Sequence, residues 1–250
     1  MDKIAVGSLL YLDNVTVSFD GFKALDGLSL VLSSGEMRAI IGPNGAGKTT
    51  MMDVITGKTK PANGAVFFDG SVDLTRLDEA AIAALGIGRK FQRPTVFDSH
   101  TVHDNLELAL AGKRGPFSAL FGRASADAAE RIDGILAAVR LGHHRETRAA
   151  YLSHGQKQRL EIAMLLAQDP KLLLVDEPAA GMSDAETREL SAILKDIAAS
   201  HTIVVVEHDM AFVRDLGVKT TVLHEGTVLA EGPFDQVSAD PRVIEVYLGR

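Results

Sequence analysis

The chain has 250 residues, enough for one large domain or two small ones, since a typical domain holds ~150 residues. Its 46% hydrophobic and 24% charged residues are average for a globular protein and exclude a chain that is disordered throughout. The 26 basic and 33 acidic residues give a net charge of −7, a balance that does not favour a general nucleic-acid binder. The sequence contains no cysteine, which excludes disulfides, a thiol nucleophile and cysteine metal ligands.

The beginning of the chain lacks a basic segment followed by a long apolar one. No apolar run approaches the ~18 residues that a membrane-spanning helix needs. We therefore expect no signal peptide, no membrane span and a cytoplasmic protein.

Two pairs of strands are predicted near the ends of the chain. Apolar residues alternate over residues 10–19, and residues 24–32 suit a partner strand. Near the other end, residues 220–224 and 227–231 flank Glu225-Gly226, a two-residue connection typical of a hairpin.

The remaining segments indicate an α/β core that is interrupted by helices. Parallel strands buried on both faces are predicted by short continuous apolar runs at residues 37–41, 172–175 and 203–206. Residues 100–148 have a mostly helical pattern, which we interpret as an inserted helical subdomain. Within it, residues 113–123 contain glycine, proline and basic residues and are expected to form an exposed loop.

A phosphate-binding loop is predicted between the strand at 37–41 and a helix at 50–55. Glycines let successive backbone N–H groups converge on phosphate oxygens, and the helix that follows directs its positive end at the same anion. Lys48 can then reach the β- and γ-phosphates, while the Thr49 hydroxyl can bind Mg²⁺. The predicted nucleotide-binding residues of this loop are Gly42, Pro43, Asn44, Gly45, Ala46, Gly47, Lys48, Thr49 and Thr50.

Two carboxylates, Asp176 and Glu177, follow the apolar strand at 172–175. An open α/β sheet binds its ligands at such strand ends. Asp176 would hold Mg²⁺, and Glu177 would orient or deprotonate the attacking water. A merely polar strand end before Pro178 is the alternative, and the phosphate-binding loop argues against it.

A second motif, Ser153-His154-Gly155-Gln156, precedes a helix with apolar residues at helical spacing. Ser153 and Gln156 have the spacing of a capping box, which by itself explains only a serine and a glutamine. The whole run also resembles the signature of ATP-binding cassette (ABC) ATPases. From about Leu9 to its end the chain is similar to this family, so we expect a P-loop NTPase core with an N-terminal antiparallel β part and an inserted α-helical subdomain.

The resemblance implies one ABC ATPase domain over residues 1–250. Its core would comprise about residues 1–92 and 165–250, and its helical subdomain about residues 93–164. The cofactors would be ATP and Mg²⁺. Such cassettes form head-to-tail dimers with ATP at the interface, so each ATP site would use residues from two chains.

The family pattern also implies a role for residues outside the loop. Catalytic roles would fall to Glu177, His208 and Gln92, and metal binding to Thr49, Gln92 and Asp176. Residues that would contact ATP held by the opposite subunit are Ser153, Gly155 and Gln156, together with Ser183 and Asp184 of the loop that crosses the dimer. Phe19 would stack on adenine, with Phe22 as the weaker candidate.

Three positions depart from the family pattern without removing a catalytic group. His154 replaces the more usual glycine of the signature. Phe19 stands where tyrosine is common, which keeps a stacking face and loses a hydroxyl. The crossing loop reads Met182-Ser183-Asp184 instead of the commoner Ala-Leu-Asp.

Further stretches resemble the ATPase subunits of branched-chain amino-acid and urea importers. They are residues 86–92, 94–97, 101–106, 177–182 and the tail 246–250. The form Gly-Arg-Lys-Phe-Gln at 88–92 and residues 107–110 favour the urea branch. The expected function is therefore ATP hydrolysis that powers a membrane importer, with urea as the expected solute.

This resemblance implies partners and a location. The partners would be a second ABC ATPase subunit, identical or different, two transmembrane permease subunits and, indirectly, an exported solute-binding protein, with no nucleic acid. The chain would sit peripherally on the cytoplasmic face of the inner membrane. A coupling helix of the permease would dock on an apolar, partly basic face formed by Arg93, Pro94, Val96 and Phe97, unless these residues only pack on their own subdomain.

Three alternatives share the ATP-site residues. One is the ATPase of a branched-chain amino-acid importer, and another is a soluble ABC ATPase such as that of iron–sulfur cluster assembly. The third is a nucleotide-binding module without turnover, against which Glu177 and His208 argue.

Overall fold

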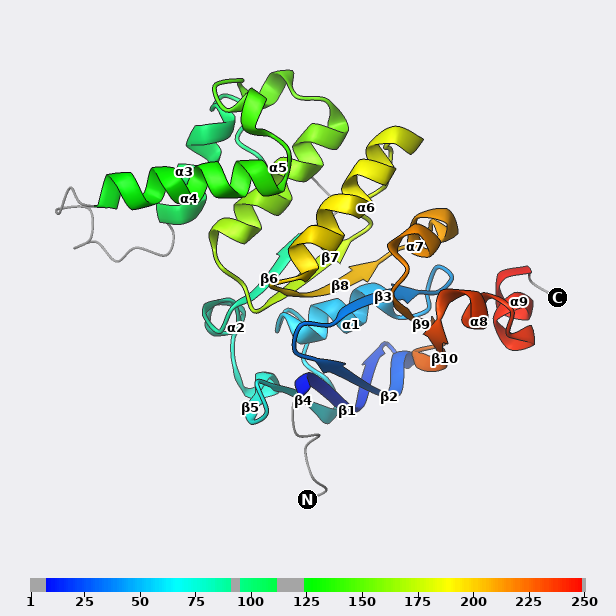
Figure 1. The fold of residues 1–250 in the computed structure, drawn as a ribbon. Helices are drawn as coiled ribbons and strands as arrows, with labels where there is room; N and C mark the ends of the chain where they lie inside the picture. The colour runs from blue at the N-terminus through cyan, green and yellow to red at the C-terminus, as the bar shows by residue number, and fades with distance from the viewer. Residues whose placement is uncertain (1–7, 91–94, 112–123, 249–250) are drawn as a thin grey trace.

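The computed structural model describes residues 8–90, 95–111 and 124–248 (Figure 1). They form a small sheet, a larger sheet and a group of helices. Gln92, Arg93, Pro94 and the predicted loop at 113–123 lie outside the described residues.

The smaller sheet is antiparallel and has four strands in the order β2-β1-β4-β5. Their bounds are Ser8–Phe19 for β1, Phe22–Ser33 for β2, Asn63–Phe68 for β4 and Val72–Asp73 for β5. The predicted pairing of residues 10–19 with 24–32 is confirmed, because Leu12 faces Leu30 and Phe19 faces Phe22 across the ladder.

The larger sheet has six strands in the order β10-β9-β3-β8-β7-β6. Their bounds are Met37–Ile41 for β3, Ile87–Lys90 for β6, Leu172–Asp176 for β7, Thr202–Val206 for β8, Lys219–His224 for β9 and Thr227–Pro233 for β10. All neighbours pair in parallel except β9 and β10, which form the predicted hairpin. Glu225 and Gly226 both have positive φ angles, as a tight two-residue turn between twisted strands requires.

The central strands bury alternate side chains in two different cores, because successive residues of a strand point to opposite faces. On β7, Leu172 and Leu174 belong to a core shared with α1 (Lys48–Ile55) and the small sheet. Leu173 and Val175 instead belong to a core shared with the helices on the other face. This double burial explains why the predicted parallel strands are continuous apolar runs.

The helices divide according to these two faces (Figure 1). In the figure, α1 lies between the two sheets, and α3 to α7 lie on the far side of the larger sheet. The remaining bounds are Glu79–Ala84 for α2, Val102–Ala111 for α3, Ala124–Ala138 for α4, His154–Ala167 for α5, Asp184–Ala198 for α6, Met210–Leu216 for α7, Phe234–Ser238 for α8 and Pro241–Leu248 for α9.

Helices α3, α4 and α5 pack together in the region where the sequence predicts a helical insertion. Buried residues from each of them, such as Leu106, Leu136 and Leu160, share one core. Helix α5 continues past the expected boundary at residues 164–165 and contacts β6. The signature at its first turn is therefore carried by one rigid element that reaches back to the larger sheet.

Candidate nucleotide-binding site

The predicted phosphate-binding loop connects β3 to α1. Gly47 is the N-cap of α1, has a φ of 99°, and a Cβ there would lie 2.6 Å from the carbonyl oxygen of Ala24. Only glycine fits this position. No side chain caps the helix, so its first N–H groups keep their capacity to bind an anion.

Lys48 lies at the start of α1 and is 8% exposed. Its Nζ donates to the carbonyl oxygens of Gly42 at 2.6 Å and Pro43 at 3.0 Å. Burial lowers the pKa of Lys48, and the carboxylates of Glu177 and Asp176 act in the opposite direction. The loop thus holds a cation against its own backbone, beside two acids.

A cavity of about 370 Å³ brings together most of the site residues that the sequence predicts for one chain. It is lined by Phe19, Phe22, Ala24, Asn44, Gly45, Ala46, Gly47, Lys48, Thr49, Thr50, Asp176, Glu177 and Val206. The aromatic rings come from the β1–β2 turn and are half exposed or more, at 50% for Phe19 and 65% for Phe22. An aromatic rim beside a phosphate-binding loop has the layout that a nucleotide requires, with a flat apolar base at one end and anionic phosphates at the other.

Asp176 and Glu177 have different environments at the end of β7. Asp176 is only 3% exposed; burial raises its pKa, while Arg89 acts in the opposite direction through its charge and a hydrogen bond. Glu177 is partly exposed and has a positive φ of 44°, an uncommon conformation for a residue other than glycine. Both of these adjacent residues nevertheless line the cavity at the phosphate-binding loop.

His208 follows β8 and lies beside Glu177, with Nδ1 3.3 Å from the Glu177 Oε1 atom. The structure therefore joins two residues that lie 31 positions apart in the sequence and that were both expected to be catalytic. Glu207, which the sequence analysis did not single out, supports this arrangement. It is fully buried, and its carboxylate accepts hydrogen bonds from the backbone N–H groups of Ala179 and His208, both at 3.0 Å.

The signature residues lie elsewhere and do not line the cavity of their own chain. Ser153 caps α5, and the predicted capping box with Gln156 is confirmed. The Ser153 hydroxyl also donates to Oε1 of Glu186 at 3.2 Å. A Cβ on Gly155 would lie 2.6 Å from the same Glu186 oxygen, so a larger residue would displace the Glu186 side chain from its present position beside Ser153.

The predicted crossing loop lies next to this signature. Ser183 caps α6 through a second capping box with Glu186, and Asp184 begins the helix and is exposed. The unusual His154 has a direct contact here, because its Nε2 lies 3.0 Å from the carbonyl oxygen of Ala180. These first turns of α5 and α6 lie side by side and expose Ser153, Ser183 and Asp184, whereas Gln156 is half-buried and Gly155 is buried. None of the five residues lines the cavity at the phosphate-binding loop.

The donor chemistry of the cavity fits a hard divalent cation. Thr49 and Asp176 both line it and offer a hydroxyl and a carboxylate oxygen, the ligand types that Mg²⁺ prefers. Gln92, expected to be the third ligand, lies outside the described residues. Two of the three predicted metal ligands, Thr49 and Asp176, therefore lie in the same cavity as the phosphate-binding loop.

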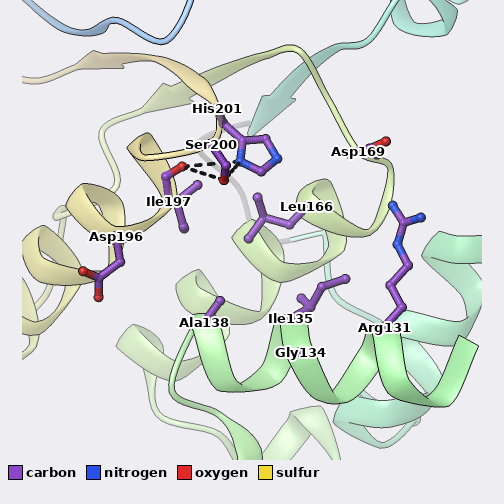
Figure 2. A pocket seen from close by; sticks show the side chains of 10 residues that line it. All are labelled: Arg131, Gly134, Ile135, Ala138, Leu166, Asp169, Asp196, Ile197, Ser200 and His201. Carbon is purple, nitrogen blue, oxygen red and sulfur yellow. Dashed lines mark hydrogen bonds between the residues drawn. The ribbon is translucent and has the colours of Figure 1, made fainter. Parts of the chain in front are cut away.

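A second pocket lies among the helices, between α4, the end of α5 and the end of α6 (Figure 2). Its floor is apolar and includes Ile135, Leu166 and Ile197. Arg131 at its rim donates to the carbonyl oxygen of Ala167 at 3.2 Å. Among the residues described as lining it, none was predicted for the ATP site, so this pocket is separate from that site.

Comparisons with known proteins agree with this geometry. The family model described as "ABC transporter" matches residues 25–180, and that described as "Branched-chain amino acid ATP-binding cassette transporter" matches residues 227–250. The high-affinity branched-chain amino acid transport ATP-binding protein LivG of Escherichia coli K12 is 36% identical, over 96% of this chain and 98% of LivG. The branched-chain amino acid transport ATP-binding protein BraF of Pseudomonas aeruginosa is 34% identical, over 96% of this chain and 98% of BraF. The narrower expectation of the urea importer subunit UrtD receives no support from LivG and BraF, whose names favour the branched-chain amino-acid alternative.

Two solved structures show the same fold. The ADP conformation of MJ1267, an ATP-binding cassette of an ABC transporter, superimposes with a TM-score of 0.85 at 32% identity and covers 97% of this chain and 99% of MJ1267. A dimeric post-hydrolysis structure of the cassette MJ0796 bound to ADP and Pi has a TM-score of 0.74 at 29% identity, over 90% of this chain and 98% of that one. In the part of the chain that the structure describes, no helix is long and apolar enough to cross a membrane. The chain belongs to the ABC transporter family of ATPases, among the ATP-binding subunits related to LivG.

Proposed function

We propose that this chain is the ATP-hydrolysing subunit of an importer for branched-chain amino acids. The observation that carries the ATPase part is the single cavity that joins the phosphate-binding loop to Asp176 and Glu177. The solute is proposed from the relatives and from the family match at residues 227–250, because no residue of the ATP site contacts a transported solute.

In this proposal the phosphate-binding loop holds the ATP phosphates. Lys48 exchanges its bonds to Gly42 and Pro43 for contacts to the β- and γ-phosphates. The uncapped N–H groups of α1 bind the same anion, and Phe19 stacks on the adenine ring, with Phe22 as the second candidate. Mg²⁺ would be held by Thr49, Asp176 and Gln92, and when bound it would neutralise charge on the phosphate oxygens.

Glu177 acts as the general base toward the attacking water, and His208 positions it. Support comes from the 3.3 Å approach of the two side chains and from the partial exposure of both, which leaves room for water. The buried Glu207 carboxylate accepts a hydrogen bond from the backbone N–H of His208. This bond holds the backbone from which the imidazole extends toward Glu177. Gln92, which follows β6 in the sequence, is proposed to act together with this pair.

Ser153, Gly155, Gln156, Ser183 and Asp184 act in trans, on ATP bound by a second ATPase subunit. Their position supports this, because they lie together outside the cavity of their own chain. The dimeric structure of MJ0796, to which this chain is similar, is further support. The second subunit is either another copy of this chain or a different ABC ATPase.

A pair of transmembrane permease subunits would dock beside residues 91–94, and an exported solute-binding protein would act through them. A cavity of about 440 Å³ is lined by residues of α2, β6 and the end of α5 together with Thr56 and Thr95, the first described residue after 91–94. Phe97 is 48% exposed nearby in the chain, whereas Val96 packs partly into the helical core. In this proposal the chain sits on the cytoplasmic face of the inner membrane. Its one ABC ATPase domain would have a core at about residues 1–92 and 165–250 and a helical subdomain at about 93–164.

Reconstitution of this chain with its permease subunits and solute-binding protein tests the solute. We expect ATP-dependent uptake of labelled leucine, isoleucine or valine into proteoliposomes, and no uptake when this chain carries Glu177→Gln. Uptake of labelled urea instead would assign the chain to the urea branch and overturn the proposed solute. An ATPase that binds no permease would favour the alternative of a soluble ABC ATPase.

A further inference from the structure

Strand β6 carries two adjacent buried basic residues, Arg89 and Lys90, with side-chain exposures of only 5% and 1%. In the parallel ladder, Arg89 is paired with Leu174 and Lys90 with Val175. Leu174 faces the core that contains α1, and Val175 faces the core that contains α5. Because paired residues share a face, the two basic side chains point to opposite sides of the sheet.

On the α1 side, one guanidinium contacts two carboxylates. The Nη1 atom of Arg89 lies 2.5 Å from Oδ1 of Asp53, and Nη2 lies 3.4 Å from Oδ2 of Asp176. Asp53 belongs to α1, the helix that follows the phosphate-binding loop, and Asp176 ends β7. Arg89 therefore ties the phosphate-binding element directly to the carboxylate proposed for the metal, and its planar fork suits two acids at once.

On the α5 side, Lys90 contacts the helix that carries the signature. Its Nζ lies 3.3 Å from Oε2 of Glu161, which is 3% exposed and lies eight residues after Ser153 on the same rigid helix. The other Glu161 oxygen accepts hydrogen bonds from the backbone N–H and the hydroxyl of Thr95. Lys90 and Glu161 thus join β6, the signature helix and the residue that follows segment 91–94.

Stability alone is a weak reason for two buried ion pairs on neighbouring residues. Removing charges from water is costly, and apolar residues of similar volume often replace buried ion pairs without loss of stability. What apolar residues do not reproduce is a fixed position for a carboxylate that has to bind a metal, or for a helix whose first turn has to meet a partner. Arg89 contacts such a carboxylate, Asp176, and Lys90 contacts such a helix, α5, through Glu161.

We propose that Arg89 and Lys90 are positioning residues that act in opposite directions from one strand. Arg89 holds Asp176 in register with α1 for binding of the metal–nucleotide complex, and Lys90 holds α5 so that Ser153 faces the ATP of the second subunit. The inference rests on the proposed roles of Asp176 and Ser153. It assigns the Asp53–Arg89–Asp176 contacts to one chain's own nucleotide site and the Lys90–Glu161 contact to the site formed in trans.

The first arm of the test measures nucleotide affinity by calorimetry, with Mg²⁺ and with EDTA, in the purified chain. For Arg89→Gln we expect the gain in ATP affinity that Mg²⁺ provides to fall at least tenfold, while affinity in EDTA changes less than twofold. Asp53→Asn keeps Arg89 beside Asp176 and should give a smaller loss, and the double variant should lose less than the sum of the two. Asp53→Asn also carries the test if Arg89→Gln does not fold.

The second arm measures ATP-dependent dimerisation by sedimentation in the Glu177→Gln background, where hydrolysis is blocked. Lys90→Met and, separately, Glu161→Gln should weaken the dimer at least tenfold and leave both calorimetric affinities of the single chain within twofold. Arg140→Gln, which removes an exposed ion pair with Asp196, is the matched control and should change neither readout.

Equal losses of affinity in Mg²⁺ and in EDTA for Arg89→Gln would overturn the positioning role and indicate general damage to the loop. An unchanged dimer in both Lys90→Met and Glu161→Gln would overturn the other half. Measurements on the wild-type chain and on Glu177→Gln alone distinguish a failure of this inference from a failure of the proposed function. If its own ATP affinity does not respond to Mg²⁺, or if Glu177→Gln alone does not dimerise with ATP, the roles given to Asp176 and Ser153 are wrong.

Discussion

At the scale of single residues, Glu177 is the position where one substitution separates ATP binding from hydrolysis. Glu177→Gln keeps the shape of the side chain beside His208 but removes the charge that would activate water. Hydrolysis should fall by ~10²–10⁴, the contribution expected of a general base. ATP affinity should persist, because Lys48, Thr49 and the loop N–H groups remain; calorimetry and phosphate release measure the two properties separately.

The conservative variant Glu177→Asp is the control for this prediction. It keeps the carboxylate but withdraws it by one methylene, so part of the activity should remain. If Glu177→Gln hydrolysed ATP at the wild-type rate in the assembled transporter, Glu177 could not be the base, and His208 would become the leading candidate.

Lys48 is the second residue with a separable effect. Lys48→Ala removes the buried ammonium group that donates to Gly42 and Pro43 and that would face the phosphates. ATP affinity should drop at least tenfold, which corresponds to about 1.4 kcal/mol. Lys171→Ala, which removes an exposed ion pair with Asp69, should leave affinity unchanged. Equal affinities of wild type and Lys48→Ala by calorimetry would contradict the assignment.

At the scale of elements, a buried arginine fastens the C-terminal hairpin to the centre of the larger sheet. Arg38 of β3 is 1% exposed and lies 2.5 Å from carboxylate oxygens of both Glu36 and Glu231, and it also donates to the Thr221 hydroxyl. Glu231 belongs to β10 and also pairs with Lys219 of β9. One ionic cluster therefore joins β3, the strand that leads into the phosphate-binding loop, to β9 and β10.

This cluster predicts a pH-dependent contribution to stability. Partial burial tends to raise the pKa of Glu231, but hydrogen bonds from Lys219 and Thr221 and the charge of Arg38 outweigh it, so the pKa lies below its ordinary value of 4.5. A carboxylate with a lowered pKa in the folded state stabilises the fold above its unfolded pKa, and this contribution is lost as the pH falls through the folded pKa.

Glu231→Gln should therefore lower the free energy of unfolding at neutral pH by about 1–2 kcal/mol, a modest figure because the side chain is 34% exposed. The difference from wild type should shrink as the pH falls below 4.5. Urea unfolding at neutral and acidic pH measures both values. Glu245→Gln on the exposed side of α9 is the control, and a difference that grew in acid would refute the sign of this argument.

At the scale of the whole molecule, features with a local cause were predictable from the sequence and features with distant partners were not. The capping box of Ser153 and Gln156 depends on four consecutive residues, and the buried strand at 172–175 on an uninterrupted apolar run. The sequence did not predict strand β6, because Arg89 and Lys90 are charged and charged residues are seldom buried. Their burial depends on ion pairs with Asp53, Asp176 and Glu161, which the fold brings close to them.

The same distinction applies to the site. A motif identifies the phosphate-binding loop and the two acids of β7, whereas the contact of Ser153 with Glu186 joins residues 33 positions apart. The full burial of Glu207 likewise follows from N–H donors on another segment, that of Ala179. No pattern within one segment indicates such contacts, because the chain between the partners determines whether they meet.

The last prediction concerns the complete ATPase unit. In the proposed function Ser153 acts on ATP held by a second subunit, and it does not line the cavity of its own chain. A single chain would then have an incomplete site. The isolated chain should be largely monomeric without ATP and hydrolyse it slowly, and the rate per chain should rise with chain concentration. Ser153→Ala should remove this rise and leave the ATP affinity of the monomer unchanged, whereas Ser200→Ala, beyond the end of α6, should behave as wild type. Sedimentation and phosphate release at several concentrations are the measurements, and rapid, concentration-independent turnover by a demonstrated monomer would show that the site is complete within one chain.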